Sequence, residues 1–598
     1  MAIRVMSENL ANKIAAGEVV EKIVSVVKEL TENSVDARSS EIKVELKESG
    51  LREIIITDNG IGMNKDDALL AFERHATSKI FNDDDLFNIS SLGFRGEALP
   101  SIASISEIEL RTCYQGEEVG TYVHIKGGKI LEVSESDGRV GTSFKITNLF
   151  YNTPARLKHL ASPYAELANV LEYLNKMALS YPDIKFRLIN DGKELLNTDG
   201  TGKILKIIKN IYGIDVAKRM IPIEGSNEDY ELKGYISLPE VTRSSKNHMT
   251  TIVNGRVVKN TTLYRSINDA YSNYKEDTRY PIVVLLIETD PSLLDVNIHP
   301  SKLDIRFSNF DNLNNLIKDT INEGIKNKLL IPSIEVTKEE IKENKPRYEN
   351  LTLEIARTVK EDNSEYKQRL SDLINNNVVN NADEEIFEET SINQELIQEV
   401  TDEKKLPELY PVGLLLGTYI VCENEQGIYL IDQHAAKERI NYEDISYQLS
   451  HPNNNTISPL VPIVIELPMN EYLILKDNYE ILNNLNIEIE EFGTSSIRVI
   501  SHPTWFTTGQ EVEIMRQIIE LILTKEKNFS LEKFNDNLAK MVSCKMSIKA
   551  NTFIDKASME RLINDLRKCH NPYNCPHGRP AIIHFSIYEL EKMFKRSI

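Results

Sequence analysis

Apolar and polar residues follow two different periods in the first part of the chain. Residues 7 to 35 place apolar side chains at roughly helical spacing, which predicts a long amphipathic helix. Residues 41 to 48, EIKVELKE, alternate strictly between apolar and charged side chains, which predicts a strand with one buried face. Residues 53 to 58, EIIITD, predict a more buried strand that ends on the carboxylate of Asp58.

The mixture of helix and strand patterns continues along the chain. A second such pattern starts near residue 205 and includes TTIVNGRVV (250 to 258) and PIVVLLIE (281 to 288). Near the C-terminus, LLLGTYIVC, the turn ENEQG and IYLID together predict a hairpin over residues 414 to 432. The fold class expected from these patterns is a multidomain α/β protein.

A polar, acidic stretch separates two regions of regular pattern. Residues 333 to 405 contain 19 Asp and Glu against 10 Lys and Arg, few aromatic residues and no sustained periodicity. This composition predicts a flexible linker. The expected domains are therefore residues 1–204, 205–332, the linker 333–405, and 406–598.

Composition narrows the class of protein. The 598 residues are 41% hydrophobic and 27% charged, which suits several globular domains. Five scattered cysteines do not make a disulfide framework, and neither a secretion signal nor a membrane-spanning run is visible. We therefore expect a cytoplasmic protein with no membrane partner. The net charge of −21 argues against broad, non-specific nucleic-acid binding by the whole chain.

Two polar residues of the first predicted helix suit phosphate chemistry. Glu29 and Asn33 lie four residues apart, so they share one helix face, where they could activate a water and bind Mg²⁺. Alone, this pair would more often be a solvated surface. DNGIGM (58 to 63) follows the buried strand, so Asp58 could accept from an exocyclic amine while its glycines admit a ligand close to the backbone.

A third motif offers backbone donors. In SLGFRGEAL (91 to 99), Gly93 and Gly96 flank Arg95 just before a predicted helix, so backbone N–H groups could cradle phosphate. A fourth stretch, GTSFKITNLFYNTPAR, spans residues 141 to 156. The order and spacing of the four motifs are more specific than any one of them.

These four motifs resemble the nucleotide-binding motifs of the GHKL ATPases, which include gyrase-type topoisomerases, ninety-kilodalton heat-shock chaperones, histidine kinases and the MutL mismatch-repair proteins. KIAAGEVV (13 to 20), RHATSKI (74 to 80), GFRGEAL, LFYNTPAR and DVNIHPSKLDIRF (295 to 307) resemble the MutL family specifically. The resemblance covers nearly all of residues 1 to 330. It implies an N-terminal Bergerat α/β sandwich ATPase domain, followed by a ribosomal-protein-like βα transducer domain.

The resemblance also implies roles for individual residues. Glu29 would be the general base for the attacking water, and Asn33 would hold Mg²⁺. Asp58 would bind the adenine amine, with Thr142 beside the adenine. Lys302 would reach the γ-phosphate from the second domain, where its charge would assist phosphoryl transfer. The other implied ATP-binding residues are Gly60, Gly62, Lys79, and the phosphate-lid residues Gly93, Phe94, Arg95 and Gly96.

The chain departs from the family pattern at two positions near this site. Thr31 stands where the family usually has an aliphatic residue, and Arg38 stands where a glycine is usual. Neither position is an implied ligand. A separate hypothesis places Arg256 and Arg265 as contacts to a DNA backbone.

Metal-ligating residue types gather in the last domain. His434 and Glu438 lie four residues apart at a predicted helix start, a nitrogen and oxygen pair that suits Zn²⁺ or Mn²⁺. Cys544 lies in SCKMSIKA, and CPHGRP (575 to 580) adds Cys575 and His577. Each residue alone is typical of an ordinary core cysteine or a surface histidine.

Together, DQHAAKER, SCKMSIKA and CPHGRP resemble the C-terminal α+β dimerisation and endonuclease domain of those MutL proteins that nick DNA. The resemblance implies Asp432 and Glu438 as catalytic residues. It implies a metal site made by His434, Glu438, Cys544, Cys575 and His577. A structural zinc without cleavage remains the alternative, although the two carboxylates favour an open site where water and phosphate bind.

The expected function is that of a homodimeric, ATP-dependent matchmaker in DNA mismatch repair that also nicks the strand to be repaired. The implied cofactors are ATP with Mg²⁺, and Zn²⁺ or Mn²⁺ at the C-terminal site. The implied partners are DNA and a MutS-type mismatch sensor, with a sliding clamp and a repair helicase as candidates. The alternative is an ATP-switched DNA-binding scaffold with structural zinc and no nuclease.

The clamp is a candidate partner because of one degenerate motif. Nicking MutL proteins usually carry QxxLxP after the DQHA helix, whereas TISPLVPIVIEL (456 to 467) has Ile457 in place of Gln. Leu460 and Pro462 fit the end of the motif. A loop that runs into a strand is the competing interpretation.

Overall fold

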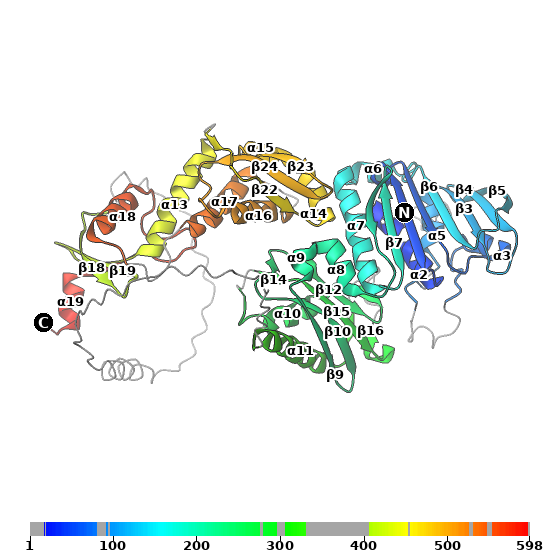
Figure 1. Cartoon of the computed structure of the whole chain (residues 1–598), viewed down its shortest axis with the longest axis horizontal. Coiled ribbons are helices and arrows are strands. Elements are labelled where there is room, and N and C mark those ends of the chain that lie inside the picture. The colour runs from blue at the N-terminus through cyan, green and yellow to red at the C-terminus, as the bar shows by residue number, and fades with distance from the viewer. Residues whose placement is uncertain are drawn as a thin grey trace, which may run out of the picture. The chain divides into compact units, whose positions relative to one another are not determined.

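The computed structural model describes most of the chain outside the predicted linker (Figure 1). The described residues are 17, 20–79, 91–93, 96–275, 279–295, 305–330, 406–451, 455–525, 530–546 and 553–595. The predicted linker, residues 333–405, lies outside them. Among the described helices, none is both long and apolar enough to cross a bilayer.

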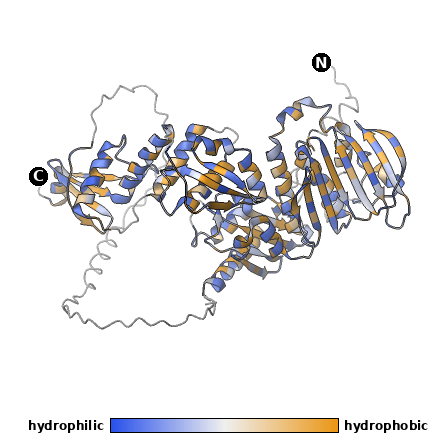
Figure 2. Ribbon diagram, turned by 45° about the horizontal axis from the view of Figure 1, so that its top comes forward, coloured by the Kyte–Doolittle hydropathy of each residue, from blue (hydrophilic) through white to orange (hydrophobic). Residues whose placement is uncertain are grey.

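Eight strands of the N-terminal region form one mixed sheet in the order β5-β4-β3-β6-β2-β1-β7-β8. The strands are β1 (Glu41–Lys47), β2 (Glu53–Asp58), β3 (Glu107–Cys113), β4 (Gly120–Lys126), β5 (Lys129–Ser136), β6 (Gly141–Thr147), β7 (Lys185–Asn190) and β8 (Lys193–Asn197). Only β1 and β7 pair in parallel. Every second residue of β1 is buried, which confirms the alternation predicted from its sequence. The same alternation is visible along the ribbon (Figure 2).

Helices pack on this sheet and complete its core. They are α2 (Ile23–Asp36), η1 (Glu48–Gly50), α3 (Lys65–Leu70), α5 (Ala98–Ile105), α6 (Pro154–His159) and α7 (Pro163–Ser180). The apolar face of α2, including Val26, Val27 and Leu30, is buried in the same cluster as Val44 and Ile56 of the sheet. Burial of that face fixes α2 so that its opposite, polar face is presented to the candidate site.

A second mixed sheet has the order β13-β12-β15-β10-β9, with β12 and β15 parallel. The strands of this region are β9 (Met220–Ser226), β10 (Tyr230–Ser237), β11 (Thr242–Arg243), β12 (Met249–Val253), β13 (Arg256–Val258), β14 (Tyr280–Pro281), β15 (Val283–Thr289), β16 (Leu294–Asp295) and β17 (Arg306–Phe307). Its helices are α8 (Ile204–Tyr212), α9 (Ile214–Ala217), η2 (Lys246–His248), α10 (Thr261–Ala270), η3 (Pro291–Leu293) and α11 (Phe310–Leu330). The strands predicted at 250–258 and 281–288 are confirmed as β12, β13 and β15.

The C-terminal region contains two further antiparallel sheets. One has the order β18-β19-β20-β25, and the other joins β21, β22 and β23 around β24. The strands are β18 (Tyr410–Leu415), β19 (Tyr419–Asn424), β20 (Gly427–Asp432), β21 (Thr456–Ile457), β22 (Ile463–Glu466), β23 (Glu488–Phe492), β24 (Ser496–Pro503) and β25 (Ile582–Ser586). The helices are α13 (Gln433–Ser450), α14 (Met469–Lys476), α15 (Tyr479–Asn484), α16 (Glu511–Leu523), α17 (Leu531–Lys545), α18 (Lys556–Lys568) and α19 (Ile587–Met593).

The predicted C-terminal hairpin is confirmed as β19 and β20, which pair antiparallel. Its first stretch, LLLGTYIVC, is divided by a turn between β18 and β19 that sequence reasoning did not place. Leu416 and Gly417 both take positive φ there, at 55° and 63°, which reverses the chain. The sheet therefore delivers Asp432 at the end of β20, directly before α13.

Candidate functional site

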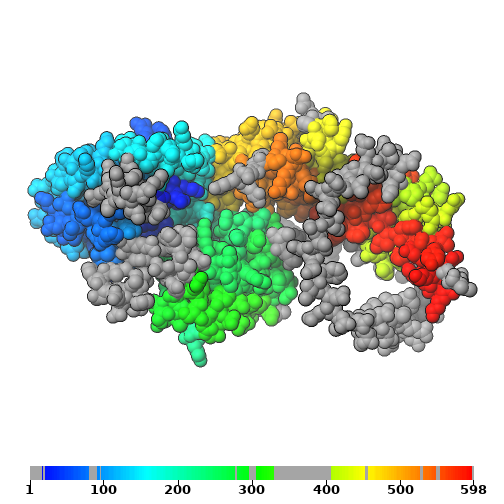
Figure 3. Space-filling view, turned by 180° about the vertical axis from the view of Figure 1, so that it is seen from behind, coloured from blue at the N-terminus to red at the C-terminus, as the bar shows by residue number. Residues whose placement is uncertain are grey.

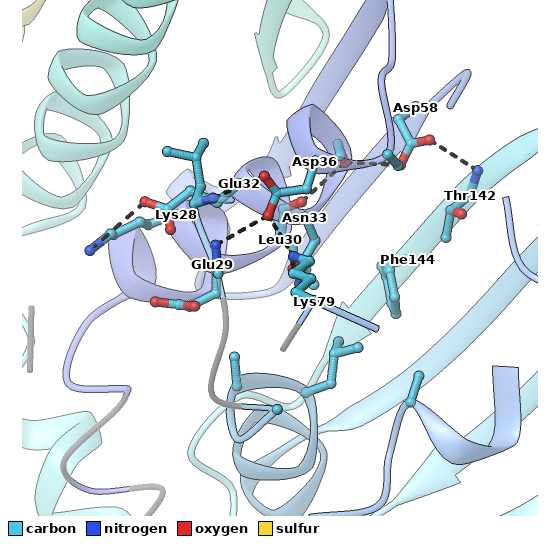
Figure 4. A pocket seen from close by; sticks show the side chains of 18 of the residues that line it. Lys28, Glu29, Leu30, Glu32, Asn33, Asp36, Asp58, Lys79, Thr142 and Phe144 are labelled. Atoms are coloured by element: carbon cyan, nitrogen blue, oxygen red, sulfur yellow. Dashed lines mark hydrogen bonds and ion pairs between the residues drawn. The ribbon is translucent and has the colours of Figure 1, made fainter. Parts of the chain in front are cut away.

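A cavity of about 1470 Å³ lies over the polar face of α2. Its lining includes eight of the residues predicted for nucleotide binding: Glu29, Asn33, Asp58, Gly62, Lys79, Gly93, Gly96 and Thr142. Figure 4 shows the labelled side chains of Glu29, Asn33 and Asp36 extending from the same helix. The fold thus brings together motifs that are separated by more than a hundred residues in the sequence.

Asp58 is buried at the end of β2, and three hydrogen-bond donors hold its carboxylate. Its Oδ1 accepts from the backbone N–H of Gly60 at 2.9 Å and of Thr142 at 3.3 Å, while its Oδ2 accepts from the Ser34 hydroxyl at 2.9 Å. Burial raises the pKa of Asp58 above its ordinary value, and the hydrogen bonds from Gly60 and Ser34 partly oppose this rise. A fixed carboxylate beside Thr142 is suited to accept from an exocyclic amine.

Two glycines of the site have no room for a side chain. Gly62 has φ of +69°, and a Cβ there would lie 1.9 Å from the carbonyl oxygen of Cys113. Gly96 has φ of +61°, and its Cβ would lie 2.4 Å from the carbonyl oxygen of Ala76. Both positions therefore require glycine on backbone grounds, independently of any ligand.

Lys79 and Asp36, which both line the cavity, form an ion pair. Lys79 Nζ lies 2.5 Å from Asp36 Oδ2 and also donates to Asn33 Oδ1 at 3.0 Å. The Asp36 carboxylate accepts from the backbone N–H of Leu92 at 3.0 Å and of Gly93 at 3.1 Å. Sequence reasoning missed Asp36, although its place three residues after Asn33 puts it on the same face of α2.

Three predicted ligands cannot be placed. Phe94, Arg95 and Lys302 lie outside the described residues. Arg256 is buried, lines the same cavity, and donates to the carbonyl oxygen of Ser91. The predicted contact of Arg256 with DNA stays a prediction, although its guanidinium has a partner within the protein. Arg265 is exposed, and its predicted contact stays a prediction.

The second group of candidate residues begins at the N-terminus of α13. The Oδ1 atom of Asp432 accepts from the backbone N–H of His434 at 2.9 Å and of Ala435 at 3.1 Å, so Asp432 is the N-cap of the helix. One turn further, Glu438 is buried, and its Oε1 lies 3.4 Å from His434 Nε2. The predicted shared face of His434 and Glu438 is confirmed.

Glu438, Cys575 and His577 converge although 137 residues separate the first two. One ligand atom from each lies within 4.8 Å of those from the other two. Glu438 and Cys575 are buried, whereas His577 is exposed and its Nδ1 lies 3.4 Å from Glu438 Oε2. Cys544, in the last turn of α17, is exposed and does not belong to this group among the described residues.

Two α13 residues that sequence reasoning missed hold the loop before Cys575. Arg439 donates from Nε to the carbonyl oxygen of Asn574 at 2.5 Å. Glu443 accepts from the backbone N–H of His570 at 2.6 Å and of Asn571 at 3.1 Å. Arg439 and Glu443 are charged residues that the sequence shows in α13. Their partners could not be predicted, because they lie more than 120 residues further along the chain.

The stretch TISPLVPIVIEL forms β21, a loop, and β22. Leu460 and Val461 in the loop are almost fully exposed. The interpretation as a loop that runs into a strand is confirmed. The clamp hypothesis for the same residues stays a prediction.

Family models match three separate parts of the chain. Residues 21–136 match the histidine kinase-, DNA gyrase B- and HSP90-like ATPase family. Residues 208–326 match the C-terminal domain of the DNA mismatch repair proteins, and residues 412–553 match the MutL C-terminal dimerisation domain. The N-terminal region is thus a GHKL-type ATPase domain within a multidomain α/β protein that ends in a MutL dimerisation domain.

Individual relatives match over the full length. A DNA mismatch repair protein MutL from Anoxybacillus flavithermus is 44% identical over 610 residues, covering 99% of each chain. Its counterpart from Listeria innocua is 43% identical over 596 residues, covering 99% of this chain and 98% of the relative. The solved Aquifex aeolicus MutL ATPase domain complexed with ADP is 25% identical, with a TM-score of 0.35, and covers 46% of this chain and 94% of that domain. At such identity to full-length relatives, the chain belongs to the MutL family of DNA mismatch repair proteins.

Proposed function

We propose that this mismatch repair protein couples ATP hydrolysis in the α2 cavity to metal-dependent nicking of DNA at α13. The observation that carries the nicking half is the convergence of Glu438, Cys575 and His577 to within 4.8 Å. The proposed domains are the ATPase domain 1–204, the transducer domain 205–332, the linker 333–405 and the C-terminal domain 406–598. The three family matches each fall within one of these folded domains.

In the ATPase half, each residue has a role that its position supports. Glu29 is the general base that takes a proton from the attacking water, and Asn33 holds Mg²⁺. Asp58 binds the adenine amine, because its carboxylate is fixed by backbone donors in the cavity. Catalysis of phosphoryl transfer depends mainly on positioning and charge neutralisation. Lys79, Gly93 and Gly96 supply cationic and backbone donors to the phosphates.

Glu29 is tested by substitution. Glu29→Ala removes the base and leaves the other cavity residues in place, so ATP binding should persist while turnover falls by about 10²–10⁴-fold. Asn33→Ala should instead lose affinity for Mg-ATP. The measurements are a steady-state phosphate-release assay and a Mg-ATP titration. Turnover by the Glu29→Ala protein within tenfold of the unsubstituted protein would remove Glu29 as the base.

The C-terminal donors fit a metal ion. A carboxylate oxygen, a sulfur and an imidazole nitrogen form a mixed set that suits Zn²⁺ or Mn²⁺. His434 lies beside Glu438, and Asp432 adds a second carboxylate at the start of the same helix. A metal bound there would supply charge stabilisation and an acidified water for phosphodiester hydrolysis. In this proposal Glu438, Cys575, His577 and His434 hold the ion.

Nicking is tested with supercoiled plasmid. The purified full chain should convert supercoiled circles into nicked circles in the presence of Mn²⁺, and EDTA should stop the conversion. Plasmid that stays supercoiled under these conditions, with a protein that still hydrolyses ATP, would contradict the nuclease half of the proposal alone.

A structural zinc in an ATP-switched scaffold is the second candidate. One observation favours it: Asp432 Oδ1 is engaged by two backbone N–H groups of α13, which is a structural use of that atom. Cysteine and histidine are also the usual ligands of structural zinc. The buried Glu438 between two histidines favours the catalytic site, because closed structural sites seldom include carboxylates.

The dimerisation family match supports a homodimer, and the C-terminal region exposes large apolar side chains on two of its elements. Large apolar side chains are exposed along β18, the turn that follows it, and α19: Tyr410, Val412, Leu416, Ile587, Tyr588, Met593 and Phe594. The red C-terminal segment that contains α19 lies at the surface (Figure 3). Exposed apolar patches of this kind mark interaction sites. We assign these exposed side chains to contacts with a second copy of the chain.

DNA, a MutS-type mismatch sensor, a sliding clamp and a repair helicase complete the proposed partners. For the clamp, Ile457 stands where a Gln amide could pair with polar groups of a pocket. Ile457→Gln should tighten clamp binding about tenfold, since ~1.4 kcal/mol is a factor of ten, and Leu460→Ala should weaken it. Surface plasmon resonance with the full chain measures both. Equal binding by all three proteins would remove this surface as the contact.

A further inference from the structure

Asp36 is surrounded by donors of the kind that bind phosphate. Lys79 Nζ lies 2.5 Å from its Oδ2, and the backbone N–H groups of Leu92 and Gly93 donate to its two oxygens at 3.0 and 3.1 Å. One ammonium and two consecutive backbone N–H groups form an anion-binding arrangement. In this structure the anion that these donors bind is the Asp36 carboxylate itself. Figure 4 shows the ion pair between Asp36 and Lys79 next to Asn33.

Lys79 also contacts Asn33, the residue that we propose as the Mg²⁺ ligand. Lys79 Nζ donates to Asn33 Oδ1 at 3.0 Å, so the ammonium occupies the oxygen that a metal ion would use. The Asp36 and Lys79 side chains are 12% and 20% exposed, which limits screening of the pair by water. The positive charge of Lys79 at this oxygen therefore opposes the binding of Mg²⁺ to it.

We propose that Asp36 is an internal competitor for the nucleotide phosphates, and so sets how tightly this ATPase binds ATP. The inference rests on the proposed ATP site. Its carboxylate and the phosphate oxygens compete for Lys79 and for the backbone N–H groups of Leu92 and Gly93. Asp36 binds Lys79 and the 91–93 segment in the absence of nucleotide, and it releases them when phosphate binds.

The competing account is that Asp36 merely orients Lys79 toward the nucleotide. The two accounts predict opposite changes in ATP affinity when Asp36 is removed. A competitor weakens ATP binding, so its removal strengthens it, whereas an orienting residue strengthens ATP binding, so its removal weakens it. The effect of a competitor must also grow with the number of phosphates and vanish for adenosine, because Asp58 and Thr142 hold the adenine end independently of Asp36.

Asp36→Asn is the direct test, because it keeps the shape and removes the charge. Neutral hydrogen bonds are about half as strong as charge-assisted ones, so the Asn side chain should be a poorer competitor. We expect ATP affinity to rise about tenfold, which corresponds to ~1.4 kcal/mol, ADP affinity to rise less, and adenosine affinity to stay unchanged. Isothermal titration calorimetry of the full chain with ATP, ADP and adenosine in Mg²⁺ measures all three.

Controls separate the possible failures. Asp66→Asn removes an exposed carboxylate of α3 that does not line the cavity, and it should change none of the three affinities. Asp36→Ser repeats the test with a smaller neutral side chain if Asp36→Asn does not fold. An unchanged or lowered ratio of ATP to adenosine affinity would overturn the proposal. Absence of ATP binding by the unsubstituted protein would instead contradict the proposed ATP site itself.

Discussion

Arg38 occupies a backbone conformation that its side chain disfavours. Its φ is +59°, in the left-handed region, directly after α2. The MutL pattern usually has glycine at this position, and glycine avoids the clash of Cβ with the neighbouring carbonyl, worth about 1–2 kcal/mol. The sequence showed that Arg38 replaces the usual glycine, but only the backbone angle shows that this replacement strains the backbone.

Arg38→Gly should therefore stabilise the first domain. The relief of strain exceeds the extra chain entropy that glycine brings to the unfolded state, which leaves a net gain of about 0.5–1 kcal/mol. Hydrogen exchange of the α2 and β1 amides measures this local stability. Arg219→Gly is the matched control, since Arg219 is also exposed but is absent from the positive-φ residues described, and it should lose stability. Faster exchange in Arg38→Gly would contradict the strain argument.

The sequence predicted several residues of the α2 cavity where a local motif marks them, and their roles toward ATP stay predictions. Asp58 lies at the end of a strand whose alternation is legible, and Glu29 and Asn33 share a helix face by spacing alone. Asp36 was not predicted, because its importance comes from backbone N–H groups 56 and 57 residues further along the chain. Contacts of that separation have no signature in a single sequence.

At the scale of elements, α13 organises the C-terminal site through three successive turns. Asp432 caps it, Glu438 belongs to the candidate metal-binding group with Cys575 and His577, and Glu443 holds the loop that leads to Cys575. The helix itself was predictable from DQHAAKER. The loop contacts were not, because they depend on how α13 and residues 570–575 pack.

Glu443→Gln should loosen that loop. A Gln side chain offers one acceptor oxygen for the two backbone N–H groups of His570 and Asn571, so the loop before Cys575 loses one hydrogen bond. Groups that orient metal ligands typically contribute about 10–100-fold to affinity. Zinc affinity in competition with a chelator should fall by that amount. Glu560→Gln, at an exposed position of α18, is the control, and equal affinities in both variants would contradict this role.

The pair of strands β3 and β4 carries a pH-sensitive contact. Hydrogen bonding to Lys126, and then to His124, lowers the pKa of Glu107 from 4.5 to about 2. Because the folded-state pKa is depressed, the stabilisation is complete above about pH 4.5 and is lost as pH falls toward 2. The contact is partly exposed, so screening by solvent reduces its contribution to the free energy of unfolding to about 1 kcal/mol.

Glu107→Gln should remove this dependence. Compared with the unsubstituted protein, the variant should be about 1 kcal/mol less stable at neutral pH and nearly equal near pH 2. Hydrogen exchange of the β3 and β4 amides over that pH range measures the difference. A stability gap that stays constant from pH 7 to pH 2 would show that the loss is not electrostatic.

At the scale of the whole molecule, the exposed apolar side chains of β18 and α19 are the feature that the sequence pattern did not predict. The sequence of α19 does not show which of its apolar side chains are exposed, because that depends on the elements that pack against the helix. The described structure leaves Tyr588 and Phe594 at 65% and 73% exposure, which a dimer contact would bury.

Tyr588→Glu should weaken the dimer by placing a charge among the exposed apolar side chains of α19. We expect the mass measured by light scattering after gel filtration to fall from dimer to monomer at micromolar concentration. Val119→Glu, at an exposed apolar position of the first domain, is the control and should remain dimeric. A Tyr588→Glu protein that stays fully dimeric would move the interface elsewhere.

Nicking by the Asp432→Asn protein tests the central claim most directly. Asparagine is as good an N-cap as aspartate, so α13 should persist while the negative charge at its first turn is lost. Supercoiled plasmid is incubated with Mn²⁺ and each protein, with ATP hydrolysis, zinc content and dimer mass measured alongside. The account predicts that nicking is lost while the other three properties are unchanged. Nicking at the unsubstituted rate would contradict a catalytic role for Asp432 and would favour the scaffold with structural zinc.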